Sequence, residues 1–295
     1  MLLGLARLTA ALPLWLLHAL GALLGRIVYL TAPRYRHYLR ANLRAAGYAD
    51  DALLGQAIAE AGRSVLELPA VWLRPHATVA GWVVQVTGWD LVEAALARRR
   101  GIIFLTPHLG CFEITAQYYA YRAAEHAPLT VLYRRPKKTA LEPLMLAGRA
   151  RPNLRVASTD LRGVRLLLRA LKHGQTVGIL PDQAPGVGEG EWADFFGRPA
   201  YTMTLADRLA AASGAQVILA FGERLPRGRG YHLRLSAMPE PLAGESPART
   251  LNRALEGLIR SCPAQYVWGY NRYKVPAGAS APGAEGRRTR KQEHA

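Results

Sequence analysis

The chain has 295 residues, half of them hydrophobic, which is enough to bury a large core and excludes global disorder. Its formal net charge is +17, from 38 basic and 21 acidic residues, and most of the basic residues are arginine. This excess reflects either a compositional bias or an anionic partner, such as an acidic protein, a phosphorylated lipid, nucleic acid or an anionic membrane face. The two cysteines, Cys111 and Cys262, are too few for a disulfide framework and lack metal-binding spacing. A reducing compartment and a chain without a bound metal are therefore predicted.

The N-terminal segment is the most apolar part of the chain. From Leu8 to Gly25 it carries no formal charge, although Pro13 would kink a helix there. Its length is borderline for crossing a bilayer. A basic run follows that would keep the rest of the chain on the cytoplasmic side; it contains Arg34, Arg36, Arg40 and Arg44. Residues 1–32 are predicted to form a membrane anchor that either spans the bilayer or lies in its interface, and the alternative is a core helix of the globular domain.

Strands and helices alternate over most of the remaining chain. Residues 36–75 are predicted to be helical, with a break at Pro69, and residues 181–200, rich in Gly and Pro, to form a loop. Strands are predicted over 101–106, 129–133, 154–158, 176–180, 216–221 and 231–237. Helices are predicted over 89–99, 111–124, 139–150, 160–172, 202–213 and 247–261. This order predicts an α/β fold in which helices flank a central, mostly parallel mixed sheet. Residues 33–276 would form this domain, and residues 277–295 a disordered basic tail.

Polar side chains follow three of the predicted strands. His108 comes after "IIFLT", Arg134 and Arg135 after "TVLY", and Asp182 after "VGIL". In an open parallel sheet, ligands bind beyond the carboxyl ends of the strands. These residues, although far apart in sequence, are therefore expected to meet in one crevice.

His108 and Glu113 form the strongest candidate pair. Within one regular helix, side chains five residues apart would point about 140° away from each other. If His108 instead lies in the turn before the helix, where Gly110 permits a close approach, Glu113 can reach back to it. A carboxylate on one ring nitrogen would fix the imidazole tautomer and leave the other nitrogen free to accept a proton. The pair thus predicts a general base and the acid that orients it.

A general base of this kind suits transfer of an acyl group from a thioester to an alcohol. The thioester is already activated, so the enzyme has only to make the alcohol nucleophilic, and a positioned base contributes roughly 10²–10⁴-fold to such a step. The sequence has no nucleotide-binding glycine fingerprint. Cys111 raises the alternative of a Cys–His–Glu hydrolase, although a lone cysteine with apolar neighbours is usually a packing residue.

Five ordered motifs resemble those of the bacterial lipid A late acyltransferases, the lauroyl and myristoyl transferases, within the lysophospholipid acyltransferase superfamily. "HLGCFE" matches the family's His-x-Gly-Asn-Trp-Glu segment, with Cys111 and Phe112 in place of Asn and Trp. The other four segments follow in the family's order: "LYRRPKK", "ILPDQAPGVGEG", "FFGRPAYTMT" and "YVWGYNRYKVP". The resemblance covers residues 3–277 and implies a glycerolipid-acyltransferase-like fold.

The resemblance implies transfer of a fatty acyl chain from acyl carrier protein to a hydroxyl of a lipid A precursor. It also implies a location at the cytoplasmic face of the cell inner membrane and no metal or other cofactor. The partners would be the acidic carrier protein, an anionic glycolipid acceptor and the inner membrane, and the net charge of +17 would steer both substrates. Nucleic acid is not an expected partner, because no recognition motif is present.

The resemblance also assigns roles to individual residues. His108 would be the general base and Glu113 its orienting acid, catalytic residues of the 33–276 acyltransferase domain. Arg134 and Arg135 would clamp a phosphate or stabilise the developing oxyanion. Substrate binding would further involve Asp182, which orients an arginine or the acceptor unless it is an ordinary turn residue, and Arg198, an anion contact. The acyl channel would be lined by Phe195, Phe196 and Gly197, although an aromatic pair is more often part of a core.

Three other functions stay open from the sequence. The chain could acylate a different membrane lipid, such as a phospholipid, an aminolipid or a pigment. It could hydrolyse an acyl thioester, or bind a membrane or nucleic acid without catalysis. Loss of function on His108→Ala would separate the enzymes from the binder, and a requirement for Cys111 would indicate the hydrolase.

Overall fold

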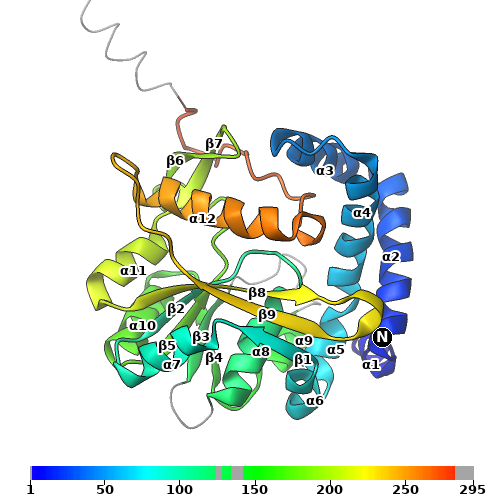
Figure 1. Cartoon of the computed structure of the whole chain (residues 1–295), viewed down its shortest axis with the longest axis horizontal. Helices are drawn as coiled ribbons and strands as arrows, with labels where there is room; N and C mark the ends of the chain where they lie inside the picture. The colour runs from blue at the N-terminus through cyan, green and yellow to red at the C-terminus, as the bar shows by residue number, and fades with distance from the viewer. Residues whose placement is uncertain (1, 124–127, 134–141, 283–295) are drawn as a thin grey trace, which may run out of the picture.

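A seven-stranded sheet, in the order β1-β9-β8-β2-β5-β3-β4, forms the centre of the computed structural model, which describes residues 2–123, 128–133 and 142–282 (Figure 1). Neighbouring strands run parallel except β8 and β9, which are antiparallel. The sheet confirms the predicted fold class. Its strands are β1 (Val83–Thr87), β2 (Ile102–Leu105), β3 (Leu129–Tyr133), β4 (Leu154–Ser158), β5 (Thr176–Ile179), β8 (Gln216–Arg224) and β9 (Tyr231–Ala237).

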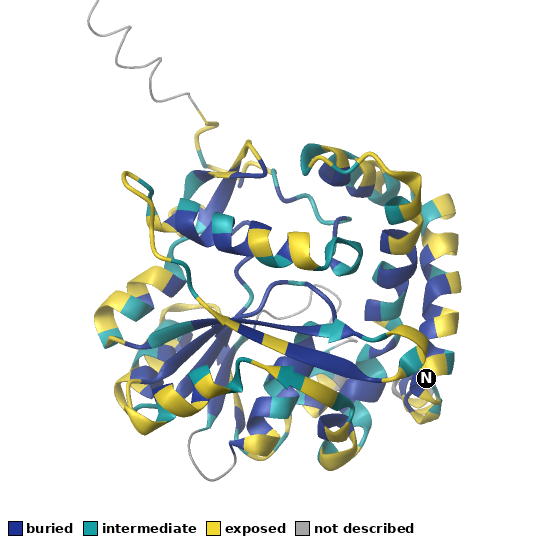
Figure 2. Ribbon diagram, viewed as in Figure 1, coloured by how far each residue is buried: buried dark blue, intermediate teal, exposed yellow. Residues whose placement is uncertain are grey.

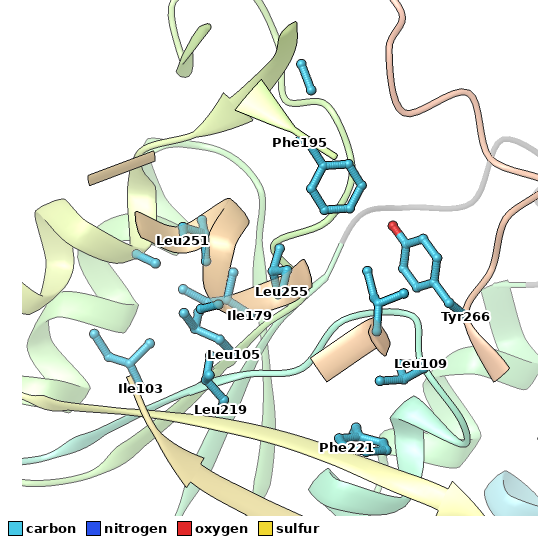
Figure 3. Close-up of a cluster of buried hydrophobic side chains, with 14 of the residues drawn as sticks. Ile103, Leu105, Leu109, Ile179, Phe195, Leu219, Phe221, Leu251, Leu255 and Tyr266 are labelled. Carbon is cyan, nitrogen blue, oxygen red and sulfur yellow. The ribbon is translucent and has the colours of Figure 1, made fainter. Parts of the chain in front are cut away.

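Helices cover both faces of the sheet, so its central strands are buried on both sides. In β2, Ile103 and Leu105 join a core with one set of helices (Figure 3). Ile102 and Phe104, whose side chains alternate with these, join a second core on the opposite face. Burial on both faces explains why the strand is a continuous apolar run in the sequence. The first core involves α10 (Leu161–Lys172), α11 (Leu205–Ser213) and α12 (Pro247–Ser261), and the second involves α7 (Trp89–Ala97) and α8 (Phe112–Arg122).

The sequence prediction was wrong about the segment 181–200, which was expected to be a loop. Gly190–Phe195 forms β6 and pairs antiparallel with β7, Arg198–Met203. The two turn residues, Phe196 and Gly197, have φ values of +49° and +71°. Positive φ at both turn positions matches the backbone twist of a tight hairpin, which glycine accommodates readily and phenylalanine rarely does.

The helical region near the N-terminus is divided more finely than the sequence predicted. Pro69 does not end a helix but lies in the first turn of one. Backbone N–H groups in a first turn have no acceptor within the helix, so a proline there loses no hydrogen bond. The sequence prediction also missed β1 and the short helix that precedes it. The elements of this region are α3 (Pro33–Ala45), α4 (Asp51–Leu66), α5 (Leu68–Leu73) and α6 (His76–Gly81).

The first two helices, α1 (Leu2–Ala11) and α2 (Leu14–Thr31), are separated at Pro13, where the sequence predicted a kink. By length and composition alone, α2 could cross a membrane, and one third of it (33%) is buried. It packs along α4, and its buried side chains include Leu17, which is fully enclosed. That residues 1–32 form a membrane anchor stays a prediction, but these residues pack against the rest of the chain.

A buried cluster of charged side chains ties α2, α4, β8 and β9 together. Arg224 donates from Nε to Glu67 at 2.8 Å, from Nη2 to Glu67 at 2.6 Å, and from Nη1 to Glu60. His18 Nε2 lies 3.1 Å from Glu67, and the Tyr231 hydroxyl donates to Glu67 at 2.8 Å. Burial would raise the pKa of Glu67, but the charge of Arg224 and its hydrogen bonds hold it well below its usual range. We call these five residues the Arg224 cluster.

Candidate active site

The loop between β2 and α8 carries His108 and is held in place by backbone hydrogen bonds on both sides. Cys111 N donates to Gly222 O at 2.8 Å, and the carbonyl of His108 accepts from Val267 N at 3.0 Å. Gly110 has a φ of +60°, and a Cβ there would lie 2.0 Å from Gly222 O. Only glycine therefore fits at this position, and the close approach is to Gly222, whereas the sequence analysis expected Gly110 to let Glu113 reach His108.

His108 and Asp182 meet at the carboxyl ends of neighbouring parallel strands, as the sequence predicted. Because β2 pairs with β5, the loops that follow these strands lie side by side. Asp182 accepts a hydrogen bond from His108 N at 3.0 Å and one from His108 Nδ1 at 2.8 Å. Its side chain is 3% exposed, whereas that of His108 keeps 18% exposure. One carboxylate thus holds both the backbone and the ring of His108, and part of the ring remains open.

The Asp182 carboxylate determines which ring nitrogen of His108 can accept a proton. An ionised carboxylate only accepts hydrogen bonds, so Nδ1 carries the hydrogen and Nε2 is left as the basic nitrogen. Nε2 lies 3.3 Å from the side-chain nitrogen of Gln183, and the Phe112 ring lies beside the imidazole at 4.9 Å between ring centroids. The geometry is that of a general base oriented by a buried acid.

The same pairing sets the acid–base properties of the two groups. Burial alone would lower the pKa of His108, but the charge of Asp182, its hydrogen bond and the charge of Glu113 raise it above its usual value. Burial would raise the pKa of Asp182, whereas the charge and hydrogen bonds of His108 lower it. The arrangement therefore favours an aspartate anion beside an imidazole that readily accepts a proton.

The sequence analysis expected Glu113 to hydrogen-bond the ring of His108, and this was wrong. The charge of Glu113 acts on His108, but Asp182 makes the hydrogen bond. Glu113 is in the first turn of α8, and its carboxylate accepts a hydrogen bond from Arg149 Nη2 at 2.6 Å. Arg149 belongs to α9 (Glu142–Arg149) and also lies over the Tyr133 ring, 5.2 Å from its centroid. Both side chains of the pair are at most 10% exposed. The reason is geometric. In the first turn of α8, the side chain of Glu113 is directed towards Arg149 of α9. Asp182, in the loop after β5, lies next to the imidazole instead.

A narrow apolar pocket lies between α8 and the sheet, with the Glu113–Arg149 pair in its wall. Including its open mouth, the pocket spans about 470 Å³, but only about 30 Å³ of it admits the centre of a water molecule. That is room for one or two waters, so a long acyl chain would have to displace side chains to enter. Its apolar lining includes Phe104, Phe112, Ala116, Leu129, Val131, Leu132, Leu154, Ile179 and Leu180.

The remaining predicted site residues have other surroundings. Arg134 and Arg135 lie outside the described residues. Arg198 is exposed and stacks on Tyr273, with its guanidinium carbon 4.1 Å from the ring centroid, and its role as an anion contact stays a prediction.

The predicted acyl-channel residues lie in the β6–β7 hairpin and away from the pocket wall. Phe195 and Phe196 are buried in the first core, where Phe195 lies near Leu255 (Figure 3). Gly197 forms the turn that follows them. Neither ring contributes to the lining of the pocket beneath α8. Their role as an acyl channel stays a prediction.

Cys111 does not have the properties of a nucleophile. Its side chain is buried, and burial, followed by the charge of Glu67, raises its pKa well above the usual value of a thiol. A neutral, enclosed thiol reacts poorly, since the thiolate is the reactive form. The described residues also contain no group of three His, Cys, Asp or Glu side chains that could hold a metal ion.

Sequence reasoning missed three residues around the base. Gln183 directly follows Asp182, so the search for polar residues after predicted strands could have found it. Tyr266 is buried, and its pKa is raised first by burial and then by the charge of Asp182. Arg149 gave no sequence signal, because it reaches the site only through the packing of α9 on α5 and α8, where Gly148 lies directly against the Trp72 side chain.

The fold is α/β, with the candidate base His108 at the rim of a parallel sheet, and comparison with known proteins assigns its family. The sequence model described as "Bacterial lipid A biosynthesis acyltransferase" matches residues 1–275, so the chain belongs to this family.

Three curated relatives illustrate the similarity. The lipid A biosynthesis lauroyltransferase of Escherichia coli K12 is 28% identical over 219 residues, which cover 72% of this chain and 69% of the relative. The lipid A biosynthesis palmitoleoyltransferase of the same organism is 27% identical over 225 residues, 75% of this chain and 71% of the relative. A lipid A biosynthesis acyltransferase of Haemophilus influenzae is 24% identical over 238 residues, 79% of this chain and 73% of the relative.

Proposed function

We propose that this protein transfers a fatty acyl chain from acyl carrier protein to a hydroxyl group of a lipid A precursor, at the cytoplasmic face of the inner membrane. Family membership supports acyl transfer to a lipid A precursor. The observation that carries the mechanism is the imidazole of His108, which is held at Nδ1 by Asp182 and whose side chain keeps 18% exposure. A buried acid, an oriented base and an adjoining apolar pocket are the groups that this reaction needs.

In the proposed reaction, Nε2 of His108 removes the proton of the acceptor hydroxyl while the hydroxyl oxygen attacks the thioester carbonyl carbon. The tetrahedral intermediate then collapses, the carbon–sulfur bond breaks, and the imidazolium returns its proton to the departing thiolate. The products are an ester and a free thiol. Asp182 stabilises the imidazolium through both stages, because its negative charge lies against the protonated ring.

The Glu113–Arg149 pair supplies the positive charge closest to the pocket among the described residues. Tetrahedral intermediates carry a negative oxygen, and a cation held in a low-dielectric site stabilises it far better than water does. Glu113 fixes the guanidinium of Arg149 at 2.6 Å, so that the cation is in place before the substrate arrives. In this proposal Glu113 positions Arg149 as an oxyanion-stabilising cation, and the role predicted for Arg134 and Arg135, which lie outside the described residues, stays a prediction.

The charge of the chain supports the two proposed substrates. Acyl carrier protein is acidic and a lipid A precursor bears phosphate groups, so a chain with a net charge of +17 attracts both. Arginine, the main basic residue here, bonds phosphate and carboxylate in bidentate fashion. The acyl chain itself is proposed to enter the apolar pocket beneath α8, where each buried methylene contributes about 0.8 kcal/mol.

The test is an assay with the purified chain, radiolabelled acyl-carrier-protein and a lipid A precursor, analysed by mass spectrometry. We expect an acyl chain esterified to a precursor hydroxyl, and a release of free thiol in equal amount. A phospholipid acceptor in parallel reactions should remain unmodified. Acylation of the phospholipid alone, or release of free fatty acid without an acylated product, would contradict the proposal.

A further inference from the structure

Both ends of α2 are attached to the folded domain. Arg74 donates to the carbonyls of Ala10 and Leu12, at 2.6 and 2.7 Å, and so fixes the turn between α1 and α2. At the other end, Tyr29 packs against the first core, and Arg36 of α3 donates to the carbonyl of Leu30 at 3.3 Å. A helix that crosses a bilayer has its two ends on opposite sides of the membrane, whereas these two ends contact one body.

The inner face of α2 packs on α4 between His18 and Gly25, at close range. Cβ atoms built on Gly21 and Gly25 would lie 2.7 and 2.1 Å from backbone atoms of α4, and one on Gly62 would lie 2.0 Å from the Gly21 carbonyl. His18, on the same face, contacts Glu67 of the Arg224 cluster. A bilayer that surrounded α2 would therefore also have to accommodate α4 and its charged side chains, at a large cost.

The outer face of α2 is exposed (Figure 2), and apart from Arg26 its large side chains are apolar. These apolar side chains follow helical spacing and point away from α4; they are Leu20 (41% exposed), Leu23 (53%), Ile27 (49%) and Leu30 (69%). Trp15, near the start of the helix, is 57% exposed, and tryptophan is typical of the membrane–water interface. A contiguous apolar stripe of this kind on the surface indicates an interaction site.

The surroundings of this stripe are positively charged. Residues 1–49 contain six arginines and no Asp or Glu, and the first acidic residue is Asp50. A surface groove on α3 adjoins the end of α2 and is lined by Pro33, Arg36, His37, Arg40, Ala41 and Arg44. Arg36 belongs both to this groove and to the hydrogen bond with Leu30, so the apolar stripe and the basic groove are continuous.

We propose that α2 and α3 form a surface that docks in the plane of an anionic phospholipid bilayer, with α2 lying in the interface instead of spanning the membrane. The stripe of Leu20, Leu23, Ile27 and Leu30 enters the outer acyl region, and the arginines of the α3 groove bind lipid phosphates. This orientation deepens the proposed function, because it brings the enzyme to the membrane that holds its lipid acceptor. The binding itself needs no acyl transfer and is tested without substrate.

The first test measures binding of the full-length chain to vesicles of phosphatidylglycerol and of phosphatidylcholine. We expect preference for phosphatidylglycerol, and a loss of about 10- to 100-fold in affinity for the double variants Leu23→Glu/Ile27→Glu and Arg40→Glu/Arg44→Glu. Matched controls lie on α10, which is far from α2 in Figure 1: Leu161→Glu, at a side chain 75% exposed, and Arg162→Glu/Arg165→Glu should bind as the wild type does. Equal binding of all variants would overturn the proposal, as would a protein dimer that only Leu23→Glu/Ile27→Glu dissociates.

The second test determines on which side of the membrane the N-terminus lies. Cysteines at Gly4 and Gly55, where a Cβ meets no atom within 4 Å, are introduced separately into a Cys262→Ser background. A membrane-impermeant maleimide should label both positions in inverted inner-membrane vesicles and neither in spheroplasts. Labelling of the Gly4→Cys variant in spheroplasts would show a spanning helix and overturn the proposal.

These outcomes are distinguishable from failure of the proposed function. Acyl transfer to a detergent-solubilised lipid A precursor should be retained by Leu23→Glu/Ile27→Glu, because these residues lie outside the candidate active site. If the wild type binds vesicles but transfers no acyl chain, the proposed function fails and the docking surface stands.

Discussion

The Arg224 cluster and the His108–Asp182 pair are both groups of buried charges, but only the second keeps a partly exposed side chain. In the Arg224 cluster all three guanidinium nitrogens of Arg224 contact carboxylates, and no side chain of Arg224 or Glu67 is more than 1% exposed. In the His108–Asp182 pair the acid is 3% exposed, but the imidazole keeps 18% exposure, and among the described residues its second nitrogen has a hydrogen-bond partner only in Gln183, at 3.3 Å. A charge satisfied on every side can only hold the fold, whereas one with an open atom can exchange a proton with a substrate.

The largest expected effect is on the rate of acyl transfer, from a substitution in the His108–Asp182 pair. His108→Ala should reduce the rate of acyl transfer by roughly 10²–10⁴-fold, because it removes the general base. The free energy of unfolding should also fall, by about 1–3 kcal/mol, because buried Asp182 loses the ring that donates to it. Steady-state rates and thermal unfolding measure the two effects. His173→Ala, at an exposed histidine after α10, is the matched control and should retain full activity. An active His108→Ala enzyme would contradict the comparison.

The opposite pattern is expected in the enclosed cluster. Glu67→Gln should lower the free energy of unfolding by about 3–5 kcal/mol, because it leaves Arg224 buried without its main counter-charge. Chemical denaturation measures this loss. The control is Glu223→Gln, on the residue next to Arg224, whose ion pair with Arg234 lies at the surface and should contribute at most about 1 kcal/mol. If Glu67→Gln abolished acyl transfer in a fully folded protein, the cluster would have a catalytic role and the contrast would fail.

The smallest effect is expected at Cys111, which lies between the two groups. Cys111→Ala should reduce stability by about 1 kcal/mol, as is usual for a small change in a packed core, and leave the rate of acyl transfer nearly unchanged. Rates and denaturation curves of the purified variant test both parts. Loss of activity by several orders of magnitude would instead indicate the thioester hydrolase that the sequence left open.

The sequence predicted where the site lies better than it predicted the contacts within it. The rule that ligands bind at the carboxyl ends of parallel strands placed His108 and Asp182 together, and their hydrogen bonds confirm it. The acid assigned to orient the imidazole was Glu113, because it is near in sequence. The order of strands, in which β2 lies beside β5, was the missing information, and no local pattern in one sequence contains it.

Two other regions show what kind of information was missing. The β6–β7 hairpin has a turn built from Phe196 and Gly197, and a phenylalanine with positive φ gives no recognisable turn signal. In α2, an uncharged apolar run is equally compatible with a spanning helix and with a helix packed on a domain. Gly21 and Gly25 indicate the packing of α2 on α4 only once their partner, Gly62, is known to be on α4.

The most direct test of the account is the pH dependence of acyl transfer in the wild type, Asp182→Asn and Glu113→Gln. The base must be unprotonated, so activity rises as pH rises through the pKa of His108, which Asp182 raises more than Glu113 does. Removing the carboxylate charge of Asp182 should lower that pKa, move the rise in activity to lower pH, and reduce the maximal rate by roughly 10²–10⁴-fold through loss of the tautomer. Glu113→Gln should move the rise less. A larger shift in Glu113→Gln than in Asp182→Asn would contradict the account, because Glu113 would then be the acid that orients the base.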